Sequence, residues 1–385
     1  MDEKQKKKNG GWQRYIAMAF FMLMGVSCGI LMVAYMRTYE TGNSLLERIL
    51  TILVLLLVMY AAMFAQIIIH EAGHLIFGLL SGYKFISFRI MSFMWVKENG
   101  KIKFRRLSLA GTGGQCLMAP PDLVDGKLPV ILYNLGGVLL NIAAGILFLG
   151  AYFAVTNIPL LSFAMLLSSA IGFISAFMNG VPMHMGTIDN DGYNAFALTR
   201  NDKARYAFWV QMKVNEQITK GVRLKDMPDE WFATSSDEEM KNSMVAAIGV
   251  FAANRLMDEQ NFEDADRLMA HLLEIESGMV GLHRNLIICD RIYLELIGEN
   301  RREVLDGMRT QEQLNFMKAM KNYMTVLRTE YAYALLCEKD SAKANEIKAR
   351  FEKRAKTHPY PIDVVTEREL MEIADKKADA AVGNI

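Results

Sequence analysis

The chain lacks the features that mark several large classes of protein. Its 385 residues contain four cysteines, scattered at Cys28, Cys116, Cys289 and Cys337 without a Cys-x-x-Cys pair. A disulfide framework and a thiolate zinc site are therefore not expected, and a reducing cytosolic face suits these thiols. The formal net charge is +1, so the chain has no overall electric field that would attract nucleic acid.

Hydrophobic sequence, by contrast, is abundant. Hydrophobic residues make up 52% of the chain, which indicates membrane segments. An N-terminal basic segment followed by an apolar run is typical of a signal peptide, but this run is too long for one and lacks a small-residue cleavage site. We therefore expect a retained first helix. The four apolar runs long enough to cross about 30 Å of hydrocarbon are residues 14–36, 50–80, 129–155 and 159–177.

A His-Glu-x-x-His motif, His70 to His74, lies inside the second apolar run. Histidines four residues apart share one helix face and can hold one zinc ion, while the intervening Glu71 can take a proton from a water molecule at the metal. A charged aspartate in the middle of a bilayer costs about 2.5–3.5 kcal/mol, so membrane helices keep such groups only with a partner or a metal. The motif therefore predicts hydrolysis within the membrane.

A third zinc ligand must come from another part of the chain, because a catalytic zinc takes three protein ligands and leaves one position open. Asn179 and Pro182 interrupt the helix at the end of the fourth run, and irregular backbone at this depth must line a protein or water-filled cavity. An aspartate such as Asp189 also suits a helix cap. The candidate ligands in this segment are Asp191, Asp189 and His184.

These motifs resemble those of the site-2 proteases, a family of zinc intramembrane metalloproteases. That family carries H-E-x-x-H in one transmembrane helix and N-x-x-P…D-G two helices later. The matching residues here are His70, Glu71 and His74, then Asn179 and Pro182, then Asp191 and Gly192. The resemblance covers roughly residues 45–200. A leucine commonly precedes the family's aspartate, whereas this chain has Asn190 there.

The resemblance implies one zinc ion per chain, bound by His70, His74 and Asp191, with Glu71 as the catalytic proton carrier. The aspartate before glycine is the family's third ligand, which favours Asp191 over Asp189.

Candidates for binding the substrate backbone or the oxyanion lie outside the zinc ligands. Asn141, in the third apolar run, is similar to the family's G-x-x-x-N element, and its carboxamide could donate to a substrate or oxyanion. Hydrogen bonding between helices is the alternative role for Asn141. Asn179 and Pro182 are further candidates for contacts with the substrate.

The remaining sequence predicts a small β-sheet and a soluble helical region. Residues 84–108 alternate apolar and polar side chains around Asn99-Gly100, a dipeptide typical of a β-hairpin turn. From about residue 201 onward helical periodicity dominates. We therefore expect a membrane α-helical fold with about four transmembrane helices and a membrane-associated sheet over residues 1–200, and a cytosolic all-α domain over residues 201–385. The residues that match the inner face of a tetratricopeptide-like helix are Phe262, Ala265, Leu268 and Leu272.

Basic residues set the expected orientation. They flank the first run on its N-terminal side and follow the zinc motif, so both segments should be cytoplasmic. We expect a multi-pass protein of a bacterial plasma membrane with both termini in the cytoplasm. Its partners would be a transmembrane or membrane-associated protein or peptide substrate, and a regulator or a second copy at the helical domain, without nucleic acid.

The sequence thus predicts a zinc metalloendopeptidase that hydrolyses peptide bonds of membrane-spanning or membrane-associated substrates. The alternative is a non-catalytic membrane adaptor with a structural zinc site and a partner-binding helical domain. Glu71 argues against the adaptor, because a structural zinc site needs no glutamate at that position.

Overall fold

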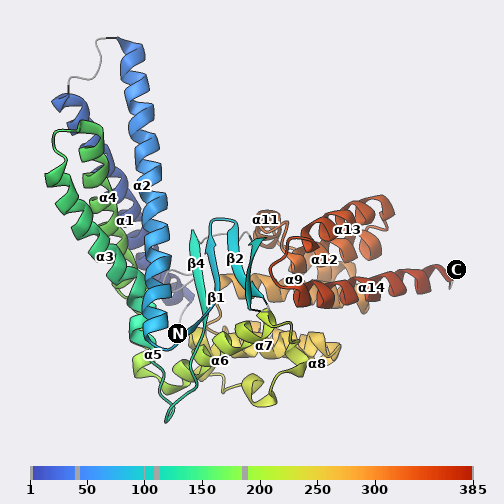
Figure 1. The fold of residues 1–385 in the computed structure, drawn as a ribbon. Helices are drawn as coiled ribbons and strands as arrows, with labels where there is room; N and C mark the ends of the chain where they lie inside the picture. The colour runs from blue at the N-terminus through green and yellow to red at the C-terminus, as the bar shows by residue number, and fades with distance from the viewer. Residues whose placement is uncertain (1–2, 40–43, 99, 108–112, 184–189, 384–385) are drawn as a thin grey trace. The chain divides into compact units, whose positions relative to one another are not determined.

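The computed structural model describes residues 3–39, 44–98, 100–107, 113–183 and 190–383 (Figure 1). The chain divides into two compact units. The first comprises Met1–Phe85 and Gly113–Asn201, and the second comprises Ile86–Thr112 and Asp202–Ile385. Most of the segment 84–108, which the sequence assigned to the membrane domain, therefore groups with the second unit.

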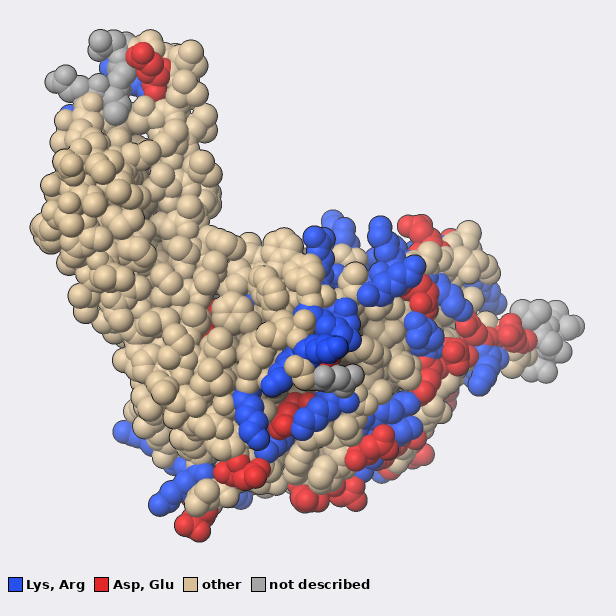
Figure 2. All heavy atoms as spheres, viewed as in Figure 1, with Lys and Arg blue, Asp and Glu red and all other residues tan. Residues whose placement is uncertain are grey.

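Long apolar helices form the first unit. The helices α2 (Leu45–Leu80), α3 (Val130–Ala154) and α4 (Pro159–Gly180) are each long and apolar enough to cross a membrane. They pack against one another, and Figure 2 shows almost no charged side chains along their visible length. Three of the four runs predicted to span the membrane thus form helices suited to it.

The first predicted run lies in α1 (Glu3–Thr38). The apolar part of this helix in the described residues is Met22–Thr38, which is shorter than a membrane span, so a first spanning helix stays a prediction. Cys28 of α1 is buried in one cluster with Leu55 of α2 and Leu167 of α4. Apolar packing therefore joins α1 to the same bundle.

The helix that carries the zinc motif begins at a capping box. Ser44 Oγ accepts a hydrogen bond from the Glu47 N–H, and Glu47 Oε2 accepts one from the Ser44 N–H, both at 3.2 Å. The 36 residues that follow make a helix of about 54 Å, longer than the hydrocarbon core. The motif, near the C-terminal end of α2, is thus placed toward one end of the helix.

The sheet contains the predicted hairpin. Its strands are β1 (Lys84–Ile90), β2 (Phe93–Glu98), β3 (Lys101–Arg106) and β4 (Gly114–Ala119), in the order β3-β2-β1-β4. The strands β2 and β3 pair antiparallel with Glu98 opposite Lys101, and Gly100 has φ +78°, as a type I′ turn requires. The hairpin prediction is confirmed, although Asn99 itself lies outside the described residues.

Beyond α5 (Asp191–Arg200), the described chain from Asp202 to Gly383 is all helical, as predicted. A turn at Gln260, with φ +60°, separates α7 (Ser243–Asp258) from α8 (Phe262–Glu274). Ala265 and Leu272 are fully buried, and Phe262 and Leu268 pack on the same core. The assignment to a tetratricopeptide-like repeat stays a prediction. The helices of the second unit are α6 (Asp202–Thr219), α7 (Ser243–Asp258), α8 (Phe262–Glu274), α9 (Gly281–Ile297), α10 (Arg302–Met308), α11 (Gln311–Ala319), α12 (Met324–Ala332), α13 (Ser341–Ala355) and α14 (Pro361–Gly383).

Candidate metal centre

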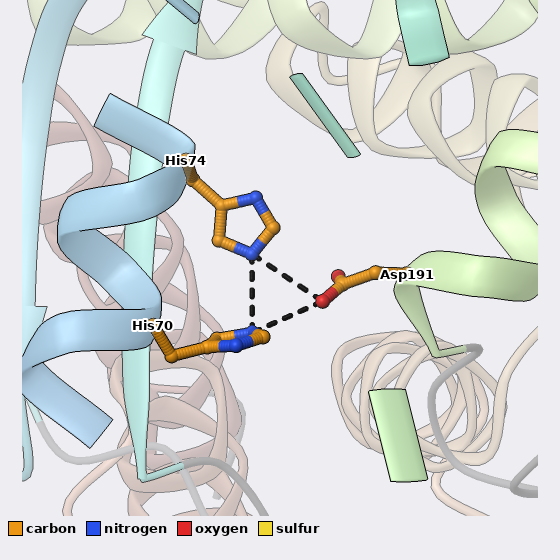
Figure 3. Close-up of side chains that lie close together, drawn as sticks. All are labelled: His70, His74 and Asp191. Atoms are coloured by element: carbon orange, nitrogen blue, oxygen red, sulfur yellow. Dashed lines mark hydrogen bonds and ion pairs between the residues drawn. The ribbon is translucent and has the colours of Figure 1, made fainter. Parts of the chain in front are cut away.

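Two histidines of α2 meet an aspartate at the first residue of α5 (Figure 3). His70 Nε2 and His74 Nε2 lie 3.2 Å apart, and Asp191 Oδ2 lies 3.0 Å from the first and 3.4 Å from the second. Tetrahedral zinc with bonds of about 2.0–2.1 Å to nitrogen places its ligand atoms about 3.3 Å from one another. The three side chains could therefore hold one metal ion.

The hydrogen bonds around His70, His74 and Asp191 leave unshared electron pairs of their nitrogen and oxygen atoms directed toward the space between the three side chains. His74 Nδ1 lies 2.8 Å from the Tyr133 carbonyl oxygen, which can only accept, so Nδ1 carries the ring proton and Nε2 is bare. Asp191 Oδ2 is buried and accepts no hydrogen bond from the described residues. Converging lone pairs repel unless a cation lies among them, so the donor set fits a metal.

Close contact between two helix backbones positions the motif. A Cβ atom on Gly73 would lie 2.2 Å from Gly136 O of α3, and one on Gly136 would lie 2.5 Å from Gly73 O. Small residues allow such approach between apolar helices. Because any larger side chain would push α2 and α3 apart, these glycines keep the Tyr133 carbonyl within reach of His74.

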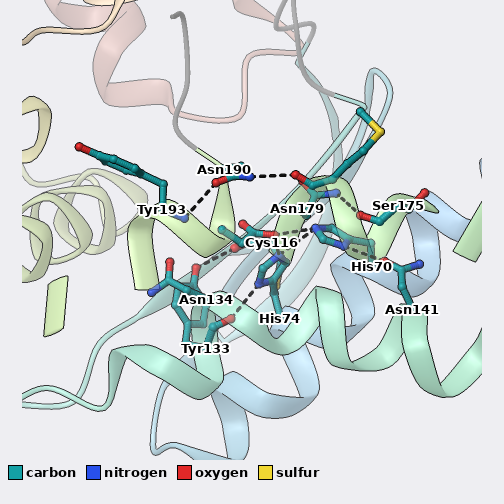
Figure 4. Close-up of polar contacts among 12 residues, drawn as sticks. His70, His74, Cys116, Tyr133, Asn134, Asn141, Ser175, Asn179, Asn190 and Tyr193 are labelled. Carbon is teal, nitrogen blue, oxygen red and sulfur yellow. Dashed lines mark hydrogen bonds and ion pairs between the residues drawn. The ribbon is translucent and has the colours of Figure 1, made fainter. Parts of the chain in front are cut away.

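Asn190 fixes the third ligand in place (Figure 4). It is the N-cap of α5, where its Oδ1 accepts the Tyr193 N–H at 2.9 Å. Its Nδ2 donates to the carbonyl oxygens of Met178 at 2.8 Å and Val181 at 2.6 Å. Asn190, which stands where the site-2 proteases commonly have leucine, thus links the start of α5 to the end of α4. This link also positions Asp191, the first residue of α5.

The predicted proton carrier, Glu71, is 8% exposed and faces β4. A Cβ atom on Gly114 would lie 2.5 Å from Glu71 Oε1, so only glycine fits beside this carboxylate. Burial, together with the charge of Glu71, raises the pKa of the neighbouring Cys116 to about 12. The thiol is therefore protonated near neutral pH, and Cys116 is not among the described residues grouped as metal ligands.

The predicted substrate-binding residues differ in their surroundings. Asn141 is fully buried, and its Oδ1 lies 2.8 Å from His70 Nδ1, which favours the role between helices over a contact with substrate. Asn179 Nδ2 donates to the Ser175 carbonyl within α4 at 3.0 Å. Pro182 is exposed at the end of α4.

Two alternative ligands, His184 and Asp189, lie outside the described residues. The N-cap of α5 in the described residues is Asn190, whose side chain accepts the N–H of the first turn.

The sequence analysis missed Gln66, which is 2% exposed and bonds to Asn141. A signal was present: Gln66 is a polar residue one helical turn before His70 in an otherwise apolar stretch. Comparisons of the chain with protein-family models, curated proteins and solved structures gave no match.

Proposed function

We propose that this chain is an intramembrane zinc metalloprotease of the site-2 protease type, which cleaves membrane-spanning or membrane-associated proteins or peptides. One observation carries the proposal. The two histidines of an H-E-x-x-H motif on a membrane-length helix converge with Asp191, and the motif glutamate lies buried beside them.

In this proposal His70, His74 and Asp191 hold the zinc ion. When bound, zinc supplies a Lewis acid that polarises a peptide carbonyl and activates a water molecule as nucleophile. Glu71 accepts the proton of that water and later donates it to the leaving amine.

The strand β4 suits an extended substrate segment. A transmembrane helix hides its peptide bonds in its own hydrogen bonds, so it must unwind before cleavage. In the strand order β4 stands at the end of the sheet, and its Gly114 touches Glu71. We propose that the unwound segment adds to this strand, since edge strands bind extended peptides through backbone hydrogen bonds.

The same proposal includes a bacterial plasma membrane with both termini in the cytoplasm, and a second unit that recruits substrates or regulators. Basic residues around the apolar runs support the orientation. The helical region supports the recruiting role, because helical arrays bind peptides on concave faces.

The test is cleavage of a single-span substrate by the wild-type chain and by Glu71→Gln, with zinc content measured for both. We expect Glu71→Gln to keep one zinc ion per chain and to lose cleavage by more than about 100-fold, the scale of general acid–base catalysis. The matched control is Glu47→Gln on the same helix, because glutamine also completes a capping box.

Cleavage that survives Glu71→Gln would reject the protease mechanism. Zinc bound at one equivalent with no cleavage of any membrane substrate by the wild-type chain would favour the adaptor.

A further inference from the structure

Two buried carboxamides connect the backbone of α4 to a zinc ligand. Gln66 Nε2 donates to the Ser168 carbonyl oxygen at 2.8 Å. Asn141 Nδ2 donates to Gln66 Oε1 at 2.7 Å and to the Gln66 carbonyl at 3.2 Å, and Asn141 Oδ1 lies 2.8 Å from His70 Nδ1. Gln66 and Asn141 are 2% and 0% exposed, so protein groups satisfy both amides.

This chain of hydrogen bonds has only one possible direction. The Ser168 carbonyl can only accept, so the NH₂ group of Gln66 must face it and the Gln66 oxygen must face Asn141. That oxygen and the Gln66 carbonyl require the NH₂ group of Asn141. The Asn141 oxygen is therefore left facing His70 Nδ1, which must carry the ring proton.

We infer that Gln66 and Asn141 are positioning residues, which hold the His70 ring with its proton on Nδ1 and its Nε2 lone pair toward Asp191. The inference rests on the proposed zinc site and concerns how the chain prepares that site. Reversing either amide would place two acceptors or two donors against each other in a buried site, where unsatisfied polar groups are unfavourable.

The two histidines are prepared by different means. The His74 ring is oriented by its hydrogen bond to the backbone carbonyl of Tyr133, which no substitution removes. The His70 ring is oriented by the side chains of Asn141 and Gln66. Packing restrains it further, since a Cβ atom on Gly137 would lie 2.5 Å from the His70 ring. The hydrogen-bond partner of His70 can therefore be removed by a side-chain substitution, whereas that of His74 cannot.

The experiment measures zinc affinity by competition with a chelator in the full-length, detergent-purified protein, and the visible spectrum of its cobalt-substituted form. Removing a hydrogen-bond partner of a metal ligand typically costs 10–100-fold in affinity. We expect Asn141→Leu to weaken zinc binding by about that factor and to change the cobalt spectrum, and we expect Gln66→Leu to weaken it by less.

Three further variants separate positioning from general packing. Because Gln66 acts through Asn141, the double variant should bind zinc no more weakly than Asn141→Leu alone. Asn141→Asp keeps an oxygen toward His70 but places a second acceptor against Gln66 Oε1, so its zinc affinity should lie between those of the wild type and Asn141→Leu. Asn134→Leu removes a buried asparagine of the same helix, whose amide bonds within α3 to the Val130 carbonyl, and should leave affinity and spectrum unchanged.

Unchanged zinc affinity in Asn141→Leu would overturn the positioning role while leaving the zinc site intact. Equal losses in Asn134→Leu and Asn141→Leu would also overturn it, by assigning the effect to packing. A wild-type chain that binds zinc with these expected shifts but cleaves nothing would uphold the inference and reject the protease. Absence of zinc binding in the wild-type chain would overturn both.

Discussion

Each unit of the molecule contains a buried cluster of polar side chains. The first cluster is His70, His74 and Asp191, and the second is Arg328, Asp290 and Glu367. The clusters differ in whether one of their own side chains supplies a positive charge. In the second unit the cation is Arg328, which is 1% exposed and lies between Asp290 and Glu367. Its Nε is 2.9 Å from Glu367 Oε2, and its guanidinium lies over the Tyr293 ring. In the first unit the described residues supply no lysine or arginine to Asp191.

The difference separates a cluster that is neutralised by its own side chains from one that could hold a metal ion. A buried ion pair neutralises itself, and its usual effect is on the cost of breaking it rather than on chemistry. Ligand atoms that converge with no lysine or arginine beside them form an arrangement that a bound metal ion would stabilise. The first cluster is therefore a candidate metal site, and the second is held together by its own ion pairs.

The largest effect is expected from Asp191→Asn, which removes the only carboxylate of the first cluster. Zinc affinity should fall by more than about 100-fold, which exceeds the cost of removing a hydrogen-bond partner of a metal ligand, and cleavage should be lost with it. Metal analysis of the purified chain measures the change, with the exposed Asp202→Asn as control. Full zinc occupancy in Asp191→Asn would show that Asp191 is not the third ligand and would favour His184 or Asp189 in that role.

A smaller but global effect is expected from Arg328→Met. Leaving Asp290 and Glu367 buried without their cation should lower the free energy of unfolding by about 3–5 kcal/mol. Replacing all three residues by apolar ones should restore much of this loss. Thermal unfolding of the full-length protein measures it, and Arg302→Met, at a side chain 62% exposed, is the control. If Arg328→Met and Arg302→Met unfold alike, the second cluster is not held together by its cation.

The smallest effect concerns His358, a buried imidazole in the second unit with no metal ligands around it. Burial lowers the pKa of His358 from 6.5 to about 4. Between these values the unfolded chain takes up a proton and the folded chain does not, so stability is complete above about pH 6.5 and falls as the pH drops toward 4. The loss at pH 5 should be about 2 kcal/mol.

His358→Asn should remove that part of the acid sensitivity. Unfolding temperatures of the full-length protein at pH 5 and pH 7.5 measure it, with the exposed His271→Asn as control. Equal acid sensitivity in wild type and His358→Asn would show that this imidazole is already charged in the fold.

The sequence predicted the elements that have a strong local signal. Apolar length predicted α2, α3 and α4, and Asn99-Gly100 predicted the β2–β3 hairpin. The spacing of His70 and His74 predicted a shared helix face. These features follow from periodicity and turn chemistry within a few residues. Asp191 was expected from the resemblance to the site-2 proteases, and its Oδ2 lies 3.0 Å from His70 Nε2.

Features that depend on distant partners were not predicted. The role of Gln66 depends on a carbonyl of α4 that lies 102 residues further along the chain. Asn190 stood out as an unusual residue, but its bonds to the end of α4 require the three-dimensional path of the chain. The place of Gly114 beside Glu71 was not predicted either, because nothing in the sequence around Gly114 indicates the carboxylate that it contacts.

The contact between Asn190 and the end of α4 has a consequence for the order of events in biosynthesis. Two of the candidate ligands emerge on α2, and the third follows only when α3 and α4 have been made and α5 has been capped against α4. Under the proposed function, a chain released before α5 would offer a metal only the two histidines. Tight zinc binding would then show that the helices from α2 to α5 have been made and have assembled.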